Sequence, residues 1–258
     1  MKKNKTLHNK VDSLELPRYV QSEIQKIKWD KEIPDYKKVK QNAVAFAKEA
    51  QAEAERKKNG TVTSEKVMRG KVAQLLFKGV LGYSSIGEKF NYMEQKSAVD
   101  SGKRADGLIG EFKRDDEISN EDLMVKAVIE WEDSSYEFDT SEEGRGVTQA
   151  FGYQAKYRWY RNQQKYVIVS NFIELRLYGS DERTAEVFDL TKLDQEYQLR
   201  RLLLFLHASR FAPVGRKSKS DTFFAKEPED EQKSVTADAA AKLGELSNKI
   251  QAMGYSET

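Results

Sequence analysis

The sequence predicts an α/β fold, in which a mixed sheet of four to five strands is flanked by helices. Two observations predict it: β-rich apolar runs alternate with helical patterns in the middle of the chain, and helical spacing dominates before them. With 258 residues, the chain is long enough for one ordinary domain and an accessory segment. We expect an N-terminal helical extension over 1–63, an α/β core over 64–211, and a flexible linker with a C-terminal helix over 212–258.

Composition excludes several classes of protein. The chain has no cysteine, which excludes disulfide scaffolds, zinc ribbons and thiol nucleophiles and is typical of a reducing cytoplasm. It has only two histidines, so a metal site would have to use oxygen ligands. No apolar run is long enough to span a membrane, and no apolar segment follows the lysine-rich N-terminus. We therefore expect a cytoplasmic protein without a membrane anchor.

Helical patterns occupy the first third of the chain. Pro17 opens a short helix that ends before Pro34, and apolar positions at helical spacing predict a longer helix over 36–58. Ser64 is a suitable N-cap for a further helix, which Gly79 and Gly82 end. The stripe that this helix would bury consists of Met68, Val72, Leu75, Leu76 and Val80.

The α/β pattern follows a mixed segment, 84–104, which we expect to be a loop. Runs rich in β-branched and aromatic residues predict strands, and amphipathic periodicity predicts helices between and after them. The expected strands are 106–112, 124–131, 166–170, 172–178 and 185–190, and the expected helices are 147–161, 193–208 and, more weakly, 236–253; the polar segment 212–235 is expected to be flexible.

The formal net charge of +2 hides an uneven distribution. Residues 106–146 carry 14 acidic and 4 basic side chains, a net charge of −10, whereas 1–60 and 147–220 each carry +6. Solvated loops and helix faces would explain this pattern. The alternative is a carboxylate cluster that binds a cation, framed by surfaces that attract a polyanion.

Three carboxylates are placed to converge. Asp106 begins one predicted strand, and Glu130 and Glu132 lie near the end of the next. Strand residues two apart point to the same face, so both glutamates can approach Asp106 across neighbouring strands. Glu130 follows a run expected to be buried, and a buried carboxylate is costly unless a partner such as a divalent cation compensates. The alternative is that these acids end the strand in solvent.

On the following predicted helix, Gln149 and Tyr153 are four residues apart and share a face close after the acidic loop. Taken with the carboxylates, these elements resemble the PD-(D/E)XK nuclease domain found at the N-terminus of type IIG restriction enzymes and of type I restriction motor subunits. The resemblance covers roughly 64–208. It is carried by RADGLIG at 104–110, AVIEWED at 127–133, GVTQAFGYQAKY at 146–157, KYVIVSNFIELRLY at 165–178 and VFDLTKLDQEYQLRRLLLFL at 187–206.

The resemblance implies a restriction-endonuclease-like fold and a set of site residues. Asp106 and Glu130 would hold a divalent metal, usually Mg²⁺ with Mn²⁺ able to substitute, and the carbonyl of Trp131 would be a further ligand. Gln149 and Tyr153 would help to position the scissile phosphate, and Lys156, one turn after Tyr153, would meet the DNA. The implied reaction is metal-assisted hydrolysis of a phosphodiester.

One position departs from the family pattern. The family usually has a lysine two residues after the glutamate, and this chain has Glu132. A glutamate cannot offset charge at the phosphate, but it could act as a general base or bind a second metal. Lys156 or Lys126 could supply the missing cation. Two interpretations stay open: an active variant, which we favour because the other motif residues are present, or a degenerate and inactive domain.

The resemblance also implies partners. The substrate would be double-stranded DNA, a methyltransferase or target-recognition domain or subunit would complete the enzyme, and a transient dimer on DNA would allow a double-strand cut. The sequence has no Asn/Asp-Pro-Pro-Tyr methyltransferase signature and no Walker A motif. The alternatives are a non-catalytic module that keeps the fold for DNA binding or assembly, and a structural interaction protein that uses the helices 36–58 and 236–253.

Overall fold

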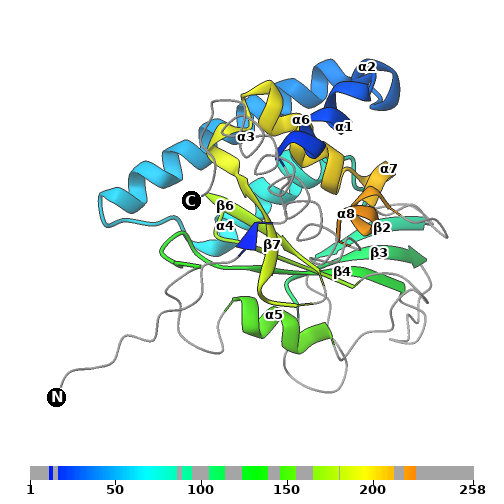
Figure 1. Ribbon diagram of the computed structural model, residues 1–258. Coiled ribbons are helices and arrows are strands. Elements are labelled where there is room, and N and C mark those ends of the chain that lie inside the picture. Colours follow the sequence, from blue (N-terminus) through cyan, green and yellow to red (C-terminus); the bar gives the residue numbers. More distant parts are fainter. Residues whose placement is uncertain are drawn as a thin grey trace, which may run out of the picture. The chain divides into compact units, whose positions relative to one another are not determined.

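A mixed seven-stranded sheet with helices on both faces forms the centre of the described structure (Figure 1). The computed structural model describes residues 12–13, 17–85, 89–94, 105–113, 124–138, 146–154, 165–179, 181–211 and 218–224. The predicted α/β class is confirmed. The chain divides into two compact units, 1–221 and 222–258, and the sheet lies in the first. The predicted limits of the extension, core and linker stay predictions.

The N-terminal helices agree closely with the predicted ones. Helix α3 (Tyr36–Lys58) has the predicted bounds, because alanines and a phenylalanine at helical spacing give it one apolar face. Asp35 starts it, with a side chain that accepts a hydrogen bond from the backbone of Lys38. The helix predicted after Ser64 forms as α4 (Glu65–Lys71), which continues directly into the π-helix η1 (Val72–Lys78). The short helix predicted from Pro17 is α1 (Pro17–Lys26), followed by α2 (Trp29–Glu32).

The sheet has the strand order β1-β7-β6-β5-β4-β3-β2. The pairs β4–β5 and β1–β7 are parallel and the others are antiparallel. Helix α5 (Val147–Gln154) lies between β4 and β5 in the chain, as a connection between parallel strands requires. The strands are β1 (Asp12–Ser13), β2 (Lys89–Glu94), β3 (Gly107–Lys113), β4 (Met124–Trp131), β5 (Tyr166–Ser170), β6 (Glu174–Tyr178) and β7 (Thr184–Asp189).

The sheet is therefore larger than the four to five strands expected, and two segments were predicted wrongly. Residues 89–94, expected to be a loop, form β2, whose Tyr92 is paired with Ile109 of β3 and is buried. Part of the segment 212–235, expected to be flexible, forms α8 (Lys219–Phe224). In both cases tertiary contacts order a segment whose own sequence has little periodicity.

The remaining helices cover the sheet. Helix α5 lies on one face, and α3 and α6 (Glu196–Leu206) lie on the other (Figure 1). The helix predicted over 193–208 is divided, because His207 has an extended backbone and α7 (Ala208–Phe211) follows it. The part of the predicted helix 147–161 beyond Gln154, and the predicted helix 236–253, lie outside the described residues.

An apolar core fills the space between α5 and the sheet. Every residue of β5 is buried, as expected for a central strand with helices on both faces. Ala150 and Tyr153 of α5 pack into this core, and Phe151 packs edge-on against Tyr178 with ring centroids 5.9 Å apart. The cluster also contains Met93, Leu108, Phe112, Val125, Val128, Val167, Val169 and Ala185.

Strand β4 contains one extra residue relative to β3. Val125 is paired with Gly110 and Ala127 with Ile109, so Lys126 has no partner in the ladder and forms a β-bulge. As a result, Val125 and Val128 both pack into the core beneath α5. The ammonium of Lys126 instead donates to both carboxylate oxygens of Asp221 in α8, at 2.8 and 2.9 Å.

Candidate active site

Asp106 lies immediately before β3, next to the end of β4. Its carboxylate oxygen Oδ2 accepts a hydrogen bond of 2.8 Å from the backbone N–H of Trp131. This bond fixes Asp106 beside the last residues of β4, because Gly107 is already paired with Ile129. Burial raises the pKa of Asp106, although the hydrogen bond from Trp131 and the charge of Arg69 oppose the rise. The predicted approach of Asp106 to the end of β4 is confirmed, but among the described residues Asp106, Glu130 and Glu132 do not gather as one metal-binding group.

Glu130 is the buried carboxylate of the site, with 4% of its surface exposed. Its Oε1 accepts a hydrogen bond of 2.6 Å from the side-chain amide of Gln149. Its Oε2 is buried and has no hydrogen-bond partner among the described residues. Burial, followed by the negative charges of Asp106 and Glu132, raises the pKa of Glu130 to about 9. An ionised Glu130 therefore requires a positively charged partner.

Gln149 and Tyr153 lie on the face of α5 that meets Glu130. The Gln149 amide nitrogen is 2.6 Å from Glu130 Oε1 and donates to the Tyr153 hydroxyl at 2.8 Å. The one-turn spacing thus places both side chains on one face of α5, as the sequence indicated: Gln149 contacts the Glu130 carboxylate, and Tyr153 contacts Gln149. Burial of Ala150 and Tyr153 against the sheet fixes the rotation of α5 and hence the direction of Gln149.

Glu132, at the position of the family's lysine, is held by the start of α5. Its Oε1 accepts a hydrogen bond of 2.9 Å from the backbone N–H of Gly146. Gly146 has a φ of 53°, and a Cβ there would lie 2.4 Å from the hydroxyl oxygen of Tyr136. Only glycine fits this position without displacing the tyrosine. The site therefore holds Glu132 through a backbone contact that depends on the local turn.

The described structure places neither Lys126 nor Lys156 at the carboxylates, where either was expected to replace the missing lysine. Lys126 lies at the bulge of β4 and pairs with Asp221, so the suggestion that it supplies the site's cation is wrong. Lys156, predicted to meet DNA, lies outside the described residues.

Arg69 of α4 is a site residue that the sequence analysis missed. Its guanidinium forms an ion pair with Oδ1 of Asp106 at 2.5 Å and a second with Glu65, one turn earlier in the same helix. Its Nε is buried without a hydrogen-bond partner among the described residues. A Glu and an Arg four residues apart are typical of a solvated helix pair, so the local sequence gave no signal of this contact.

Aromatic side chains support the end of β4. Trp131 packs edge-on against Phe77 of η1 with ring centroids 5.6 Å apart, and stacks on Phe172 at 5.8 Å. Phe172 has a φ of 67°, an uncommon conformation for a bulky residue. The turn between β5 and β6 holds it there, because Ser170 accepts from its N–H and Asn171 accepts from the next two N–H groups. The backbone of Glu130 and Trp131 is thus packed from two sides.

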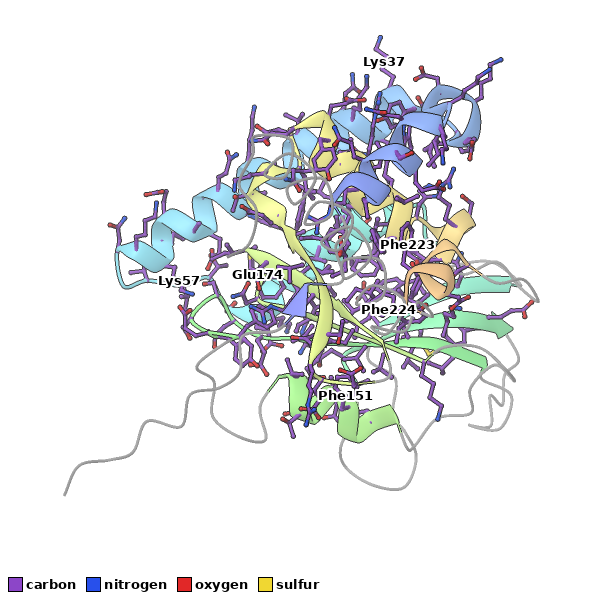
Figure 2. The ribbon with its side chains drawn as sticks, in the orientation of Figure 1. Lys37, Lys57, Phe151, Glu174, Phe223 and Phe224 are labelled. Atoms are coloured by element: carbon purple, nitrogen blue, oxygen red, sulfur yellow. The ribbon has the colours of Figure 1, made fainter. Side chains whose placement is uncertain are left out.

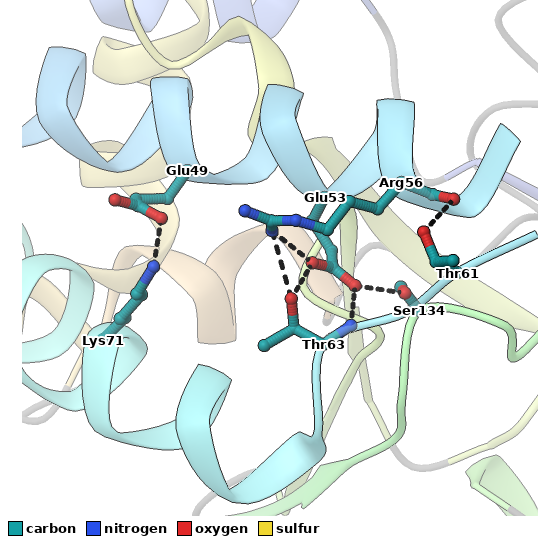
Figure 3. A network of polar contacts seen from close by, with 7 residues as sticks. All are labelled: Glu49, Glu53, Arg56, Thr61, Thr63, Lys71 and Ser134. Carbon is teal, nitrogen blue, oxygen red and sulfur yellow. Dashed lines mark hydrogen bonds and ion pairs between the residues drawn. The ribbon is translucent and has the colours of Figure 1, made fainter. Parts of the chain in front are cut away.

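A buried polar network ties the loop after β4 to α3 (Figure 3). Glu53 of α3 is fully buried and accepts hydrogen bonds from the N–H and hydroxyl of Thr63, from the Ser134 hydroxyl and from Arg56, at 2.6–2.8 Å. Burial by itself would raise its pKa, but the hydrogen bonds from Ser134, Thr63 and Arg56 outweigh burial and lower the pKa to about 2. Ser134 follows Glu132 by two residues, so α3 helps to fix the end of the site.

This network predicts a stability change at acid pH. The pKa of Glu53 in the folded chain is below its ordinary value of 4.5, so the stabilisation is complete above pH 4.5 and is lost as pH falls towards 2. The loss would reach about 3 kcal/mol. Glu53→Gln should lower the free energy of unfolding at pH 7 by about 1–3 kcal/mol, because its amide N–H groups would face donors.

Urea unfolding at pH 7 and pH 3 measures this effect. Glu55→Gln, an exposed position two residues away in α3, is the matched control and should resemble the wild type at both pH values. Equal pH dependence for Glu53→Gln and the wild type would contradict the prediction.

The family model of the MmeI N-terminal domain matches residues 41–253, most of the chain. The chain belongs to the MmeI N-terminal domain family. This domain is the N-terminal region of a type IIG restriction enzyme, which agrees with the type IIG part of the resemblance. The match begins within α3 and includes the whole described site. Comparison with curated proteins and with solved structures finds no significant match.

Membership in the MmeI N-terminal domain family places the site in a restriction-modification context. Within the part of the chain that the structure describes, no helix has the length and apolar character needed to cross a bilayer. In that same part, no three acidic, histidine or cysteine side chains gather as a metal-binding group. Asp106 and Glu130 lie near one another at the ends of β3 and β4, and the backbone N–H of Trp131 is bound to Asp106.

Proposed function

We propose that this domain is a Mg²⁺-dependent DNA endonuclease of a restriction-modification system. The observation that carries the proposal is the state of Glu130. It is buried, one of its oxygens has no partner among the described residues, and Asp106 lies close enough to raise its pKa. A buried carboxylate in this state destabilises the fold unless a cation joins it. The family supports the restriction context.

The residues present fit a magnesium ion. Magnesium in phosphoryl-transfer sites is commonly bound by one or two carboxylates and the phosphates of the substrate, and not by a complete protein cage. Asp106 and Glu130 would hold the ion with the Trp131 carbonyl, since the N–H of Trp131 already binds Asp106 at 2.8 Å. A bound divalent cation would supply an activated water and stabilise charge on the pentavalent phosphate.

The protein's own groups would orient the reaction. Gln149 fixes Glu130 through its amide and is itself 2.8 Å from the Tyr153 hydroxyl, so both set the direction of the carboxylate. Glu132, held by Gly146, is the group available to accept a proton from the attacking water. Trp131 and its aromatic neighbours keep the backbone rigid beneath these side chains.

The proposal includes the partners that the resemblance implies. Double-stranded DNA is the substrate, a methyltransferase or target-recognition domain or subunit provides specificity, and transient dimerisation on DNA brings two sites to the two strands. Lys37 and Lys57 project near opposite ends of α3 (Figure 2), and Lys57 also forms an ion pair with Glu137. Such lysines could contact phosphates without reading sequence. A cytoplasmic location is part of the proposal.

A plasmid assay with the full chain tests the proposed function. Supercoiled DNA should be nicked or linearised with Mg²⁺ or Mn²⁺, and excess EDTA should reduce the rate at least about a thousandfold, because hydrolysis of a phosphodiester without the ion is very slow. Restoring Mn²⁺ after EDTA is the control for irreversible damage. The absence of both metal binding and cleavage, with and without a methyltransferase or recognition partner, would refute the proposal.

The second candidate function is a catalytically inactive module that binds DNA or assembles with a partner. The observation that favours it is Glu132 in place of the lysine. This alternative expects salt-sensitive DNA binding that survives Asp106→Ala without any cleavage. Glu132→Lys distinguishes the two: it should restore cleavage in a decayed site and impair a working site that uses Glu132.

A further inference from the structure

We infer that Arg69 supplies the positive charge at the scissile phosphate that a lysine at position 132 would otherwise supply. The inference rests on the proposed nuclease function and adds one catalytic residue to it. Arg69 comes from α4, an element outside the strand and helix that carry the motif residues.

Position 132 cannot provide this charge. It is a glutamate, and its carboxylate accepts the backbone N–H of Gly146 at 2.9 Å. Glu132 also adds negative charge around Glu130 and contributes to raising the pKa of that residue. Asp106, Glu130 and Glu132 thus bring negative charge to the ends of β3 and β4. Position 132 supplies no positive charge that would offset it.

Lys126 is excluded by the geometry of β4. The bulge directs its side chain to Asp221 and the ring of Tyr166, and only 2% of its surface is exposed. Bringing its ammonium to Glu130 would break a buried ion pair and disrupt the ladder between β3 and β4. The lysine closest in sequence to the carboxylates is therefore committed to the opposite face.

Arg69 is already at the carboxylates. Its guanidinium contacts Asp106 Oδ1 at 2.5 Å, and Asp106 Oδ2 is bound to Trp131, the residue between Glu130 and Glu132. A guanidinium has five N–H donors in a planar fork that matches the oxygens of a phosphate. The Nε of Arg69 is buried with no partner in the described structure, so at least one donor is unused in the DNA-free protein.

The helix that carries Arg69 is firmly anchored. Met68 and Val72, the neighbours that flank it on the buried side, have no exposed surface, and α4 runs without a break into η1. Glu65 holds the guanidinium from the same helix. About a fifth of the Arg69 side chain (22%) remains exposed, so a phosphate could reach it while its stem stays fixed.

The test compares Arg69→Ala, Arg69→Lys and the double variant Arg69→Ala/Glu132→Lys with the wild type. Lys66→Ala, an exposed position in the same helix, is the matched control. The readouts are Mn²⁺ affinity without DNA by calorimetry, DNA affinity in Ca²⁺, and single-turnover cleavage in Mn²⁺. Circular dichroism and thermal unfolding show whether each variant is folded.

We expect Arg69→Ala to slow cleavage about a hundredfold and to weaken Ca²⁺-supported DNA binding about tenfold. Its affinity for Mn²⁺ should be unchanged or higher, because a cation that competes for Asp106 is gone. Arg69→Lys should recover much of both losses. The added lysine at 132 should restore Ca²⁺-supported DNA binding, which does not need Glu132 as a proton acceptor, but not cleavage. Lys66→Ala should resemble the wild type.

Two results would overturn the inference while leaving the proposed function intact. One is cleavage and DNA binding by Arg69→Ala at wild-type levels. The other is a parallel loss of folding and metal affinity that Arg69→Lys repairs but Glu132→Lys does not, which would make Arg69 a structural ion-pair partner. A wild-type chain that neither binds Mn²⁺ nor cleaves DNA would instead refute the nuclease function itself.

Discussion

Replacing Glu130 with glutamine is expected to reduce DNA cleavage at least about a thousandfold while leaving the fold as stable as before or more so. Glutamine has nearly the shape of glutamate and can still accept the hydrogen bond from Gln149. It carries no charge, so the cost of burying a carboxylate beside Asp106 and Glu132 disappears. The gain in the free energy of unfolding without metal should be about 1 kcal/mol or more at pH 7.

Loss of a metal ligand at position 130 should lower activity while stability is kept or rises. Loss of a structural residue there should lower stability as well. The measurements are single-turnover cleavage in Mn²⁺ and urea unfolding in EDTA, with Glu182→Gln, an exposed carboxylate before β7, as the control. The variant should also lose any stabilisation that Mn²⁺ gives to the wild type. A Glu130→Gln protein that cleaves normally would rule out Glu130 as a metal ligand, and one that unfolds would show a structural role.

Replacing Asp221 with alanine is expected to lower the free energy of unfolding by about 3–5 kcal/mol. Asp221 is buried, and its carboxylate accepts hydrogen bonds from Lys126, the Tyr166 hydroxyl and the backbone N–H of Ser218, at 2.6–2.9 Å. Hydrogen bonds and the positive charge of Lys126 keep the pKa of Asp221 below its usual range, although burial opposes them. Without Asp221, the Lys126 ammonium would stay buried beside the rings of Tyr166 and Phe211 and would lose the carboxylate that now accepts two of its hydrogen bonds.

The double variant Lys126→Met/Asp221→Ala provides the control. Methionine matches the length of the lysine stem without its charge, so the double variant should be more stable than Asp221→Ala alone, by about 2 kcal/mol. Urea unfolding at pH 7 measures all three proteins. A loss below about 1 kcal/mol for Asp221→Ala would mean that the ion pair contributes little and that solvent reaches Lys126 easily.

Local sequence patterns predicted the helices and strands whose apolar residues recur at the spacing of a single type of secondary structure. The alanines of residues 36–58 gave the bounds of α3, and the apolar run 124–131 gave those of β4. The shared face of Gln149 and Tyr153 followed from their one-turn spacing on a helix after the acidic loop. These features depend on periodicity, which a sequence shows directly.

The features that were missed depend on contacts between distant segments. Arg69 precedes Asp106 by 37 residues, and nothing near it in the sequence distinguishes it from a surface arginine. Residues 89–94 became a strand through pairing with β3, and Asp221 gave its helix a buried partner 95 residues away. Regular alternation along β4 would place Lys126 on the same face of the sheet as Glu130. The extra residue of the strand instead turns the Lys126 side chain to the opposite face.

The bulge in β4 also constrains the length of the chain at this point. Before Lys126, the odd-numbered position Val125 faces the core. After Lys126, the even-numbered position Glu130 faces the candidate site. Deleting Lys126 would restore one regular alternation and leave Val125 and Glu130 on their present face, but it would remove the side chain that pairs with Asp221. Relatives that lack the extra residue of β4 are therefore expected to lack this buried ion pair as well.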